Sequence, residues 1–274
     1  MLLKIKRELR KYASKERKKV NEWFFKTGKG EYGEGDIFIG VRVPDIRKVA
    51  EQFIDADWDV LRKLLESKIH EERLLAVLIL VGQNKQAIKN QNRKQQRKIV
   101  NFYLQNQKGV NNWDIVDSSA HHILGQAILD GIKKEKLLDE MVRSENLWTR
   151  RIAIIATFAF IRQGDIRPTL RLAKRLLGDK EDLMHKAVGW MLREVWKLGE
   201  VNKKKKFSQS VRSPQVRSIS LTDGLVENKK GEKAQGQVEE FLIKNYDQLP
   251  RTTLRYAIER MPEMKRKIFL RGEF

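Results

Sequence analysis

A tryptophan and an aspartate one helical turn apart form the pattern in this chain that is best suited to chemistry. Residues 111–120 read Asn-Asn-Trp-Asp-Ile-Val-Asp-Ser-Ser-Ala, and either asparagine can cap a helix that begins here. Trp113 and Asp117 are four residues apart and therefore share a face of that helix. An aromatic ring with a carboxylate one turn away suits a cationic substrate. The alternative is that Trp113 packs in the core while Asp117 pairs with a lysine or an arginine.

The apolar residues that follow predict how this helix is oriented. At helical spacing they form one stripe, which consists of Val116, Ala120, Ile123, Leu124 and Ala127. Asp117 falls at the border of the stripe, near Leu124 and Ile128, where a carboxylate is costly unless it is paired or used. Asp114 is expected to point further out.

Two later clusters combine tryptophan with cations. Residues 145–154 read Glu-Asn-Leu-Trp-Thr-Arg-Arg-Ile-Ala-Ile, so Arg150 and Arg151 open an apolar helix. They could grip phosphate or form ion pairs at the surface. Residues 186–194 place Trp190 at the edge of an apolar stripe, and Gly189 beside it leaves room for the close approach of another element. Ordinary core packing is the alternative for Trp190.

Two other candidate sites are rejected. Residues 28–33 match a dinucleotide-binding fingerprint, but that motif needs a strand before it, and here a helix precedes it, so we predict a structured loop at 27–36. Among the four histidines, His121 and His122 are adjacent and point about 100° apart on a helix, which disfavours a shared metal. No metal or organic cofactor is therefore expected.

The composition favours a polyanionic partner. The 274 residues carry a formal net charge of +21 and are 41% hydrophobic, which permits a real core. Nucleic acid is the first candidate, because each phosphate neutralised by Lys or Arg releases counterions. Cysteine is absent, no apolar run approaches the ~20 residues that span a bilayer, and the N-terminus is charged too early for a signal peptide. We expect a cytoplasmic protein and no membrane partner.

The elements that must position these residues are helices. Helical periodicity predicts segments at 2–13, 15–26, 44–54, 57–67, 70–84, 86–105, 112–130, 134–143, 147–163, 166–178, 182–198, 237–246, 250–260 and 262–270. The nearest to a strand is 37–41, which is short and has no evident partner. Faint self-similarity at about 35–45 residues suggests stacked helix pairs. We expect one all-α domain over 1–274, a HEAT-like superhelix with a basic concave face, interrupted by a flexible insertion at 201–236.

Taken together and in order, the clusters resemble the AlkD family of HEAT-repeat alkylpurine DNA glycosylases. Residues 25–47 look like the N-terminal signature of the DNA alkylation repair branch, and the resemblance covers about 20–200 and resumes near 237. It implies that Trp113 and Asp117 are the catalytic tryptophan and aspartate, that Arg151 grips DNA and that Trp190 is the second tryptophan. We also expect Arg150, Lys186 and Arg193 to contact DNA. The insertion at 201–236 departs from the family's compact C-terminal repeat.

The activity implied by the resemblance is removal of cationic N3- or N7-alkylated purines from double-stranded DNA by a monomer that needs no cofactor and no enclosed base-flipping pocket. Asp117 would stabilise oxocarbenium character on the deoxyribose and position water. Two alternatives stay open. One is a non-catalytic HEAT-repeat protein that binds unusual DNA structures. The other is a helical-repeat scaffold for protein partners, which predicts an exposed apolar groove and no need for the charge of +21.

Overall fold

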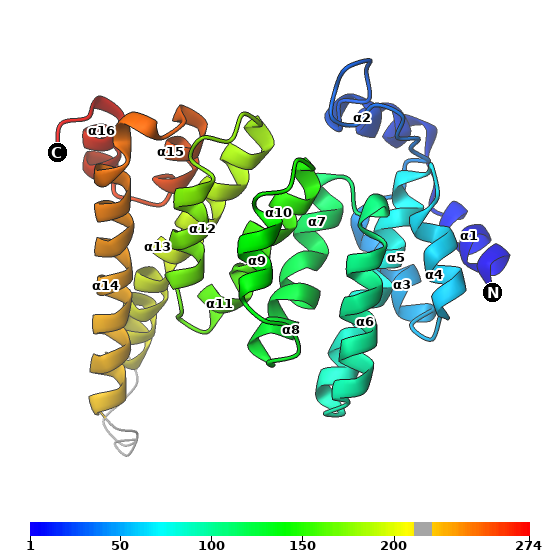
Figure 1. Ribbon diagram of the computed structural model, residues 1–274, viewed down its shortest axis with the longest axis horizontal. Coiled ribbons are helices and arrows are strands. Elements are labelled where there is room, and N and C mark those ends of the chain that lie inside the picture. The colour runs from blue at the N-terminus through cyan, green and yellow to red at the C-terminus, as the bar shows by residue number, and fades with distance from the viewer. Residues whose placement is uncertain (211–220) are drawn as a thin grey trace. The chain divides into compact units, whose positions relative to one another are not determined.

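The computed structural model describes residues 1–210 and 221–274, with side chains described in 1–200 and 231–274. The elements in these residues are helices (Figure 1). Within the same residues, one parallel bridge joins Ile37 to Ile69. The prediction of an all-α fold is confirmed. The expectation that 37–41 has no partner was wrong, because the Ile37 N–H donates to the Lys68 carbonyl at 3.0 Å and its carbonyl accepts from His70 at 2.9 Å. None of the described helices combines the length and apolar character needed to cross a bilayer.

The chain forms two compact units, of which the first spans Met1–Glu135. Its elements are α1 (Leu2–Arg10), α2 (Lys15–Phe24), α3 (Val43–Gln52), α4 (Trp58–Leu65), α5 (His70–Lys89), α6 (Arg93–Gln105), η1 (Gln107–Gly109), α7 (Trp113–Ala120), η2 (His121–Gly125) and α8 (Gln126–Leu129). The predicted break near residue 85 was wrong, because α5 continues to Lys89.

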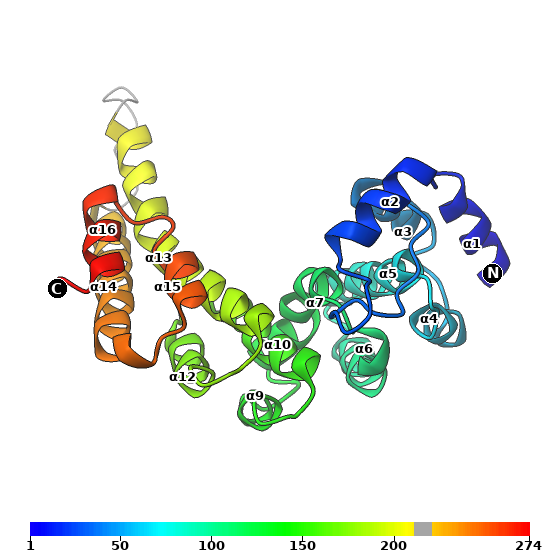
Figure 2. The ribbon, with the colours of Figure 1, turned by 90° about the horizontal axis from the view of Figure 1, so that it is seen from above.

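Helix α5 is the centre of the first unit. It packs against α3, α4, α6 and α7 (Figure 2). All residues from His70 to Val81 are buried, including His70, Glu71, Glu72 and Arg73 in its first turn. A helix that is buried on every side must find partners for such polar groups within the protein. The first turn of α5 is therefore where a network of buried charges is expected.

The second unit spans Lys136–Phe274. Its elements are α9 (Lys136–Met141), α10 (Leu147–Ala156), α11 (Phe158–Arg162), α12 (Arg167–Arg175), α13 (Asp182–Ser210), α14 (Leu221–Lys244), η3 (Tyr246–Gln248), α15 (Arg251–Ala257) and α16 (Glu263–Arg271). Helix α13 packs against both α14 and α15. Helices α13 and α14 extend well into the segment 201–236, for which the sequence predicted a flexible insertion and no helix. Residues 211–220 of that segment lie outside the described residues.

Candidate active site

Helix α7 begins where the sequence predicted and buries the stripe that it predicted. The side chain of Asn112 accepts a hydrogen bond from the Trp113 N–H at 2.8 Å and so caps the helix. The five stripe residues, Val116, Ala120, Ile123, Leu124 and Ala127, are all buried. Burial of this stripe leaves Trp113 and Asp117 only half-buried.

A change in helix geometry follows directly after α7. The turn His121–Gly125 is a π-helix, which leads into α8 without a break in the chain. Such turns widen the backbone spiral locally and are frequent at functional sites. Here the Asn84 side chain of α5 donates to the His122 carbonyl at 2.8 Å. This contact fixes the π-turn beside the half-buried face of α7.

Trp113 and Asp117 line one pocket of about 640 Å³, which lies wholly within the first unit. The prediction that they share a face of the helix is therefore confirmed. Aromatic side chains form part of the wall, and polar side chains of α7 and η2 another part. The lining includes Phe24, Phe25, Phe38, Trp113, Asp117, Ser118, His121 and His122.

Trp113 is held by residues at and after the end of α2. Its ring stacks on Phe25, with centroids 5.3 Å apart and planes 16° apart, and meets the edge of Phe24 at 5.8 Å. Its Nε1–H donates to the Tyr32 hydroxyl at 3.3 Å, and that hydroxyl donates to the Phe24 carbonyl at 3.3 Å. One face and one edge of the indole are thus fixed, as a substrate-positioning ring requires.

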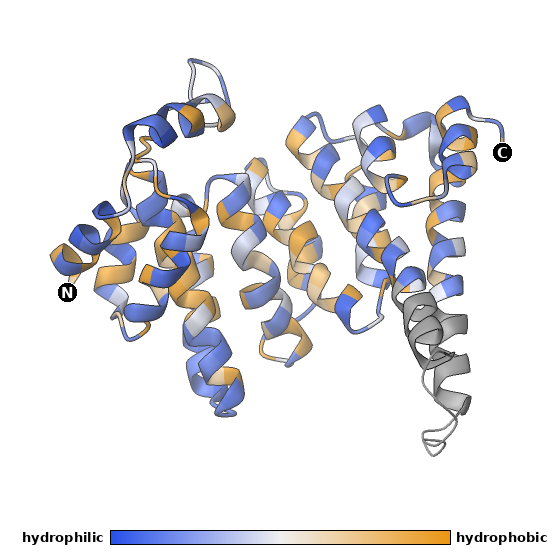
Figure 3. Ribbon diagram, turned by 180° about the vertical axis from the view of Figure 1, so that it is seen from behind, coloured by the Kyte–Doolittle hydropathy of each residue, from blue (hydrophilic) through white to orange (hydrophobic). Residues whose placement is uncertain are grey.

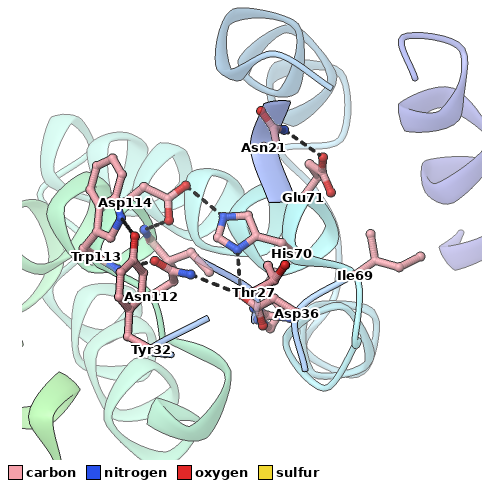
Figure 4. Close-up of polar contacts among 12 residues, drawn as sticks. Asn21, Thr27, Tyr32, Asp36, Ile69, His70, Glu71, Asn112, Trp113 and Asp114 are labelled. Atoms are coloured by element: carbon pink, nitrogen blue, oxygen red, sulfur yellow. Dashed lines mark hydrogen bonds and ion pairs between the residues drawn. The ribbon is translucent and has the colours of Figure 1, made fainter. Parts of the chain in front are cut away.

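Asp114 does not point outward, contrary to the sequence-based expectation. Its residue surface is 9% exposed, and its Oδ2 atom lies 2.9 Å from Nε2 of His70 (Figure 4). Its Oδ1 atom accepts the Ile115 N–H at 2.8 Å. Helical spacing could not reveal this contact, because the partner lies on α5, 44 residues earlier in the chain.

His70 lies between two carboxylates. Its Nδ1 atom is 3.1 Å from Oδ2 of Asp36, which also accepts the Asn112 side-chain N–H at 3.1 Å, while Arg73 donates to Asp36 Oδ1 at 2.6 Å (Figure 4). Burial alone would lower the pKa of His70, but Asp114 and Asp36 raise that pKa to about 9. Near neutral pH the imidazole is therefore a cation that donates to both carboxylates.

The network connects the loop before α3 to the first turn of α7. Asp36 ends the loop that carries Tyr32, while Asn112 and Asp114 flank Trp113. Burial opposes ionisation of Asp36, but His70 and Arg73 hold its pKa below the usual range. Two cations and two anions thus balance in a buried space, and their mutual attraction offsets part of the cost of burying them.

The glycine-rich segment forms the loop that the sequence predicted between two helices. Carboxylates of the same loop occupy its backbone donors: Glu31 accepts the Gly28 N–H at 2.9 Å, and Glu34 accepts the Gly30 N–H at 2.7 Å. In a phosphate-binding loop these N–H groups would face the ligand. The loop is instead a support for Tyr32 and Asp36.

Glu71 is a further buried anchor that the sequence did not reveal. It is 1% exposed, and its carboxylate accepts the N–H groups of Ile39, Gly40 and Val41 at 2.8–3.2 Å. Gly40 has φ +80°, and a Cβ there would lie 2.1 Å from the Ser14 carbonyl oxygen. The chain between the loop and α3 is therefore fixed closely against α2.

Trp190 belongs to the second unit. Its Nε1–H donates to Glu194 at 3.0 Å, one turn along α13, and its ring centroid lies 6.0 Å from that of Phe158. A Cβ at Gly189 would lie 2.6 Å from the Thr253 carbonyl oxygen. The predicted close approach at Gly189 is confirmed, and the approaching element is α15.

The four predicted DNA-contacting cations also lie in the second unit, and each has partners there. Arg150 donates to both carboxylate oxygens of Asp179, at 2.7 and 3.1 Å. Arg151 is 4% exposed and donates to the Leu183 carbonyl. Lys186 pairs with Asp182 at 2.7 Å, and Arg193 pairs with Glu259.

Comparison with known proteins decides the family. Residues 5–205 match the model of the family described as DNA alkylation repair enzyme. The chain belongs to this family. No curated protein and no solved structure is a significant match to it. The matched span includes the pocket with Trp113 and Asp117, and it extends through Trp190. A role in DNA alkylation repair, with DNA as substrate, follows from membership.

In this DNA alkylation repair enzyme, the sequence pointed to Trp113 and Asp117, which line one pocket, but it did not reveal the buried groups around them. His70, Asp36 and Glu71 gave no local signal, because each acts through a partner more than 30 residues away. Within the described residues, no group of three or more His, Asp or Glu side chains is arranged to hold a metal ion.

Proposed function

We propose that the protein is a DNA glycosylase that hydrolyses the N-glycosidic bond of cationic N3- or N7-alkylated purines in duplex DNA. The observation that carries the proposal is that Trp113 and Asp117 line one pocket, in a chain of the DNA alkylation repair family. An indole face attracts a cationic ring, and a carboxylate stabilises positive charge that develops on the sugar.

The reaction needs little acid catalysis. An alkylated purine carries a positive charge, so when the bond from its ring nitrogen to C1′ breaks, the electron pair neutralises the ring and the base leaves. Positive charge then develops on C1′ and the ring oxygen of deoxyribose, where the Asp117 carboxylate stabilises it. Water adds to C1′, and Asp117 accepts the proton that the water loses.

The proposal extends to the second unit. Trp190 would provide a second aromatic contact to the lesion, and Arg151 would hold a phosphate near it. Arg150, Lys186 and Arg193 would contact DNA after exchanging their present carboxylate partners for phosphate. We further propose that the helices of the two units form a HEAT-like superhelix with a basic concave face, which acts as a monomer.

Base release from alkylated DNA tests the proposal. Methylated duplex DNA is incubated with the protein, and free bases are separated and identified by mass spectrometry. The expected result is free 7-methylguanine and 3-methyladenine above the spontaneous rate, with abasic sites in equal number. Binding to the same DNA without base release would favour the non-catalytic DNA-binding alternative.

A further inference from the structure

Three arginines at the pocket of Trp113 and Asp117 are better placed to meet DNA than the cations that the sequence singled out. Arg17 on α2, with Arg42 and Arg47 at α3, lines this pocket. All three are exposed. In Figure 3 the ribbon of α2 is coloured mostly hydrophilic, with hydrophobic residues at its C-terminal end.

The partners of these arginines differ from those in the second unit. Arg17 and Arg47 form no ion pair with any residue in 1–200 or 231–274. Arg42 lies 3.2 Å from Asp45, but its side chain is 71% exposed and Lys48 shares the same carboxylate. Arg150, by contrast, is already bound through two hydrogen bonds to Asp179. An arginine without a carboxylate partner binds phosphate without first losing an ion pair.

Two of the acidic groups that line the pocket have other partners than these arginines. Glu71 is occupied by three backbone N–H groups, and Asp114 by His70. The pocket therefore presents guanidinium groups from α2 and α3, and a carboxylate with an indole from α7. An alkylated nucleotide has the complementary pattern, because its phosphodiester is negative while its base is positive.

We propose that Arg17, Arg42 and Arg47 form a phosphodiester-binding site that holds the DNA backbone beside Asp117. The inference rests on the proposed function for the position of the lesion, and on the pocket for the position of the arginines. Arginine suits this role because its planar fork binds two phosphate oxygens at once. Backbone contacts of this kind position DNA without reading its sequence.

Salt dependence of binding measures such contacts directly. The binding constant of the full chain for an unmodified duplex is measured from 50 to 300 mM salt by fluorescence anisotropy. Wild type is expected to bind more weakly as salt rises. In the double variant Arg17→Gln/Arg47→Gln, the slope of log K against log salt should shrink by about 1 for each arginine. Affinity should fall equally for unrelated sequences.

A matched control removes the same charge elsewhere in the first unit. Lys94→Gln/Arg97→Gln changes two exposed cations of α6 that do not line the pocket. Equal slopes in the two double variants would overturn the inference, as would an unchanged slope in the pocket variant. Arg17→Lys/Arg47→Lys should keep the slope but weaken binding, because lysine contacts phosphate through a single point. If Arg17→Lys/Arg47→Lys bound DNA as tightly as wild type, the proposed phosphodiester-binding site would be contradicted.

The two proposals can fail separately. If wild type releases no base but the salt slope is smaller in the pocket variant than in the control variant, the phosphate site stands and the glycosylase proposal is contradicted. If wild type releases base and both double variants show the same slope, the phosphate site is contradicted and the glycosylase proposal stands. Thermal unfolding of each variant verifies that these exposed substitutions leave the fold intact.

Discussion

Nε2 of His70 lies 2.9 Å from Oδ2 of Asp114, so the first turn of α5 is joined to the first turn of α7 through a buried ion pair. The same imidazole contacts Asp36, at the end of the loop that carries Tyr32. Trp113, between Asn112 and Asp114, receives support from both sides. His70 lines the same pocket as Asp117 and is thus a positioning residue for the helix that bears Asp117.

The ion pair of His70 predicts a loss of stability at alkaline pH. The folded pKa of His70, about 9, exceeds the ordinary value near 6.5 expected in the unfolded chain. Protonation therefore stabilises the folded state. This contribution, on the order of 3 kcal/mol, is complete below about pH 6.5 and is lost as pH rises through about 9. Urea unfolding at pH 6 to 10 measures it.

The variant His70→Gln isolates this contribution from other groups that titrate above pH 9. Its free energy of unfolding should be lower than that of wild type at pH 7, and the two should converge as pH approaches 10. A constant difference between wild type and variant across this range would show that the His70 proton does not stabilise the fold.

Removing the hydroxyl of Tyr32 should make the position of the Trp113 ring less fixed, while the ring stays in the pocket. Tyr32→Phe deletes the acceptor of the indole N–H. We expect unfolding to require about 1 kcal/mol less. Base release under single-turnover conditions should slow by a factor of about five, because a misplaced ring stabilises the transition state less well. Tyr12→Phe, outside the pocket, is the matched control. Equal rates of base release for wild type and Tyr32→Phe would show that this hydrogen bond does not position Trp113 for the reaction.

Gly189 should be intolerant of a methyl group. In Gly189→Ala the new Cβ would lie 2.5 Å from Cβ of Tyr256 and 2.6 Å from the Thr253 carbonyl oxygen. Separating α13 from α15 should cost about 1–3 kcal/mol of stability. Gly178→Ala is the control, since a Cβ there meets nothing within 4 Å. Chemical unfolding of both variants compares them, and equal stabilities would contradict the packing described at Gly189.

The sequence predicted the features of the fold that depend on residues close together in the chain. An asparagine cap, the buried stripe of α7 and the shared face of Trp113 and Asp117 follow from local spacing, and all were confirmed. The structure shows that the capping residue is Asn112. The orientation of Asp114 was wrong, because local spacing does not reveal a partner on α5. The extension of α13 to Ser210 was missed, because its polar C-terminal residues lack the apolar period that marks an amphipathic helix.

The cations illustrate the same limit at the level of function. Arg150 and Arg151 are recognisable in the sequence as a pair at the start of an apolar helix, whereas Arg17 and Arg47 lie among ordinary basic residues. Only the folded chain shows that Asp179 holds Arg150, and that Arg17 and Arg47 meet at the pocket of Asp117. The sequence pattern pointed to Asp117, but only the folded structure shows that Arg17 and Arg47 line the same pocket.

The central claim is that the Asp117 carboxylate stabilises charge on the sugar, and Asp117→Asn tests it most directly. The substitution keeps the size of the side chain and removes its charge. Single-turnover release of 7-methylguanine is measured beside affinity for the same DNA, with Asp59→Asn, on exposed α4 surface, as the control. We predict that Asp117→Asn slows release by about 100-fold or more, while affinity and unfolding stay close to wild type. Release at the wild-type rate would contradict the account.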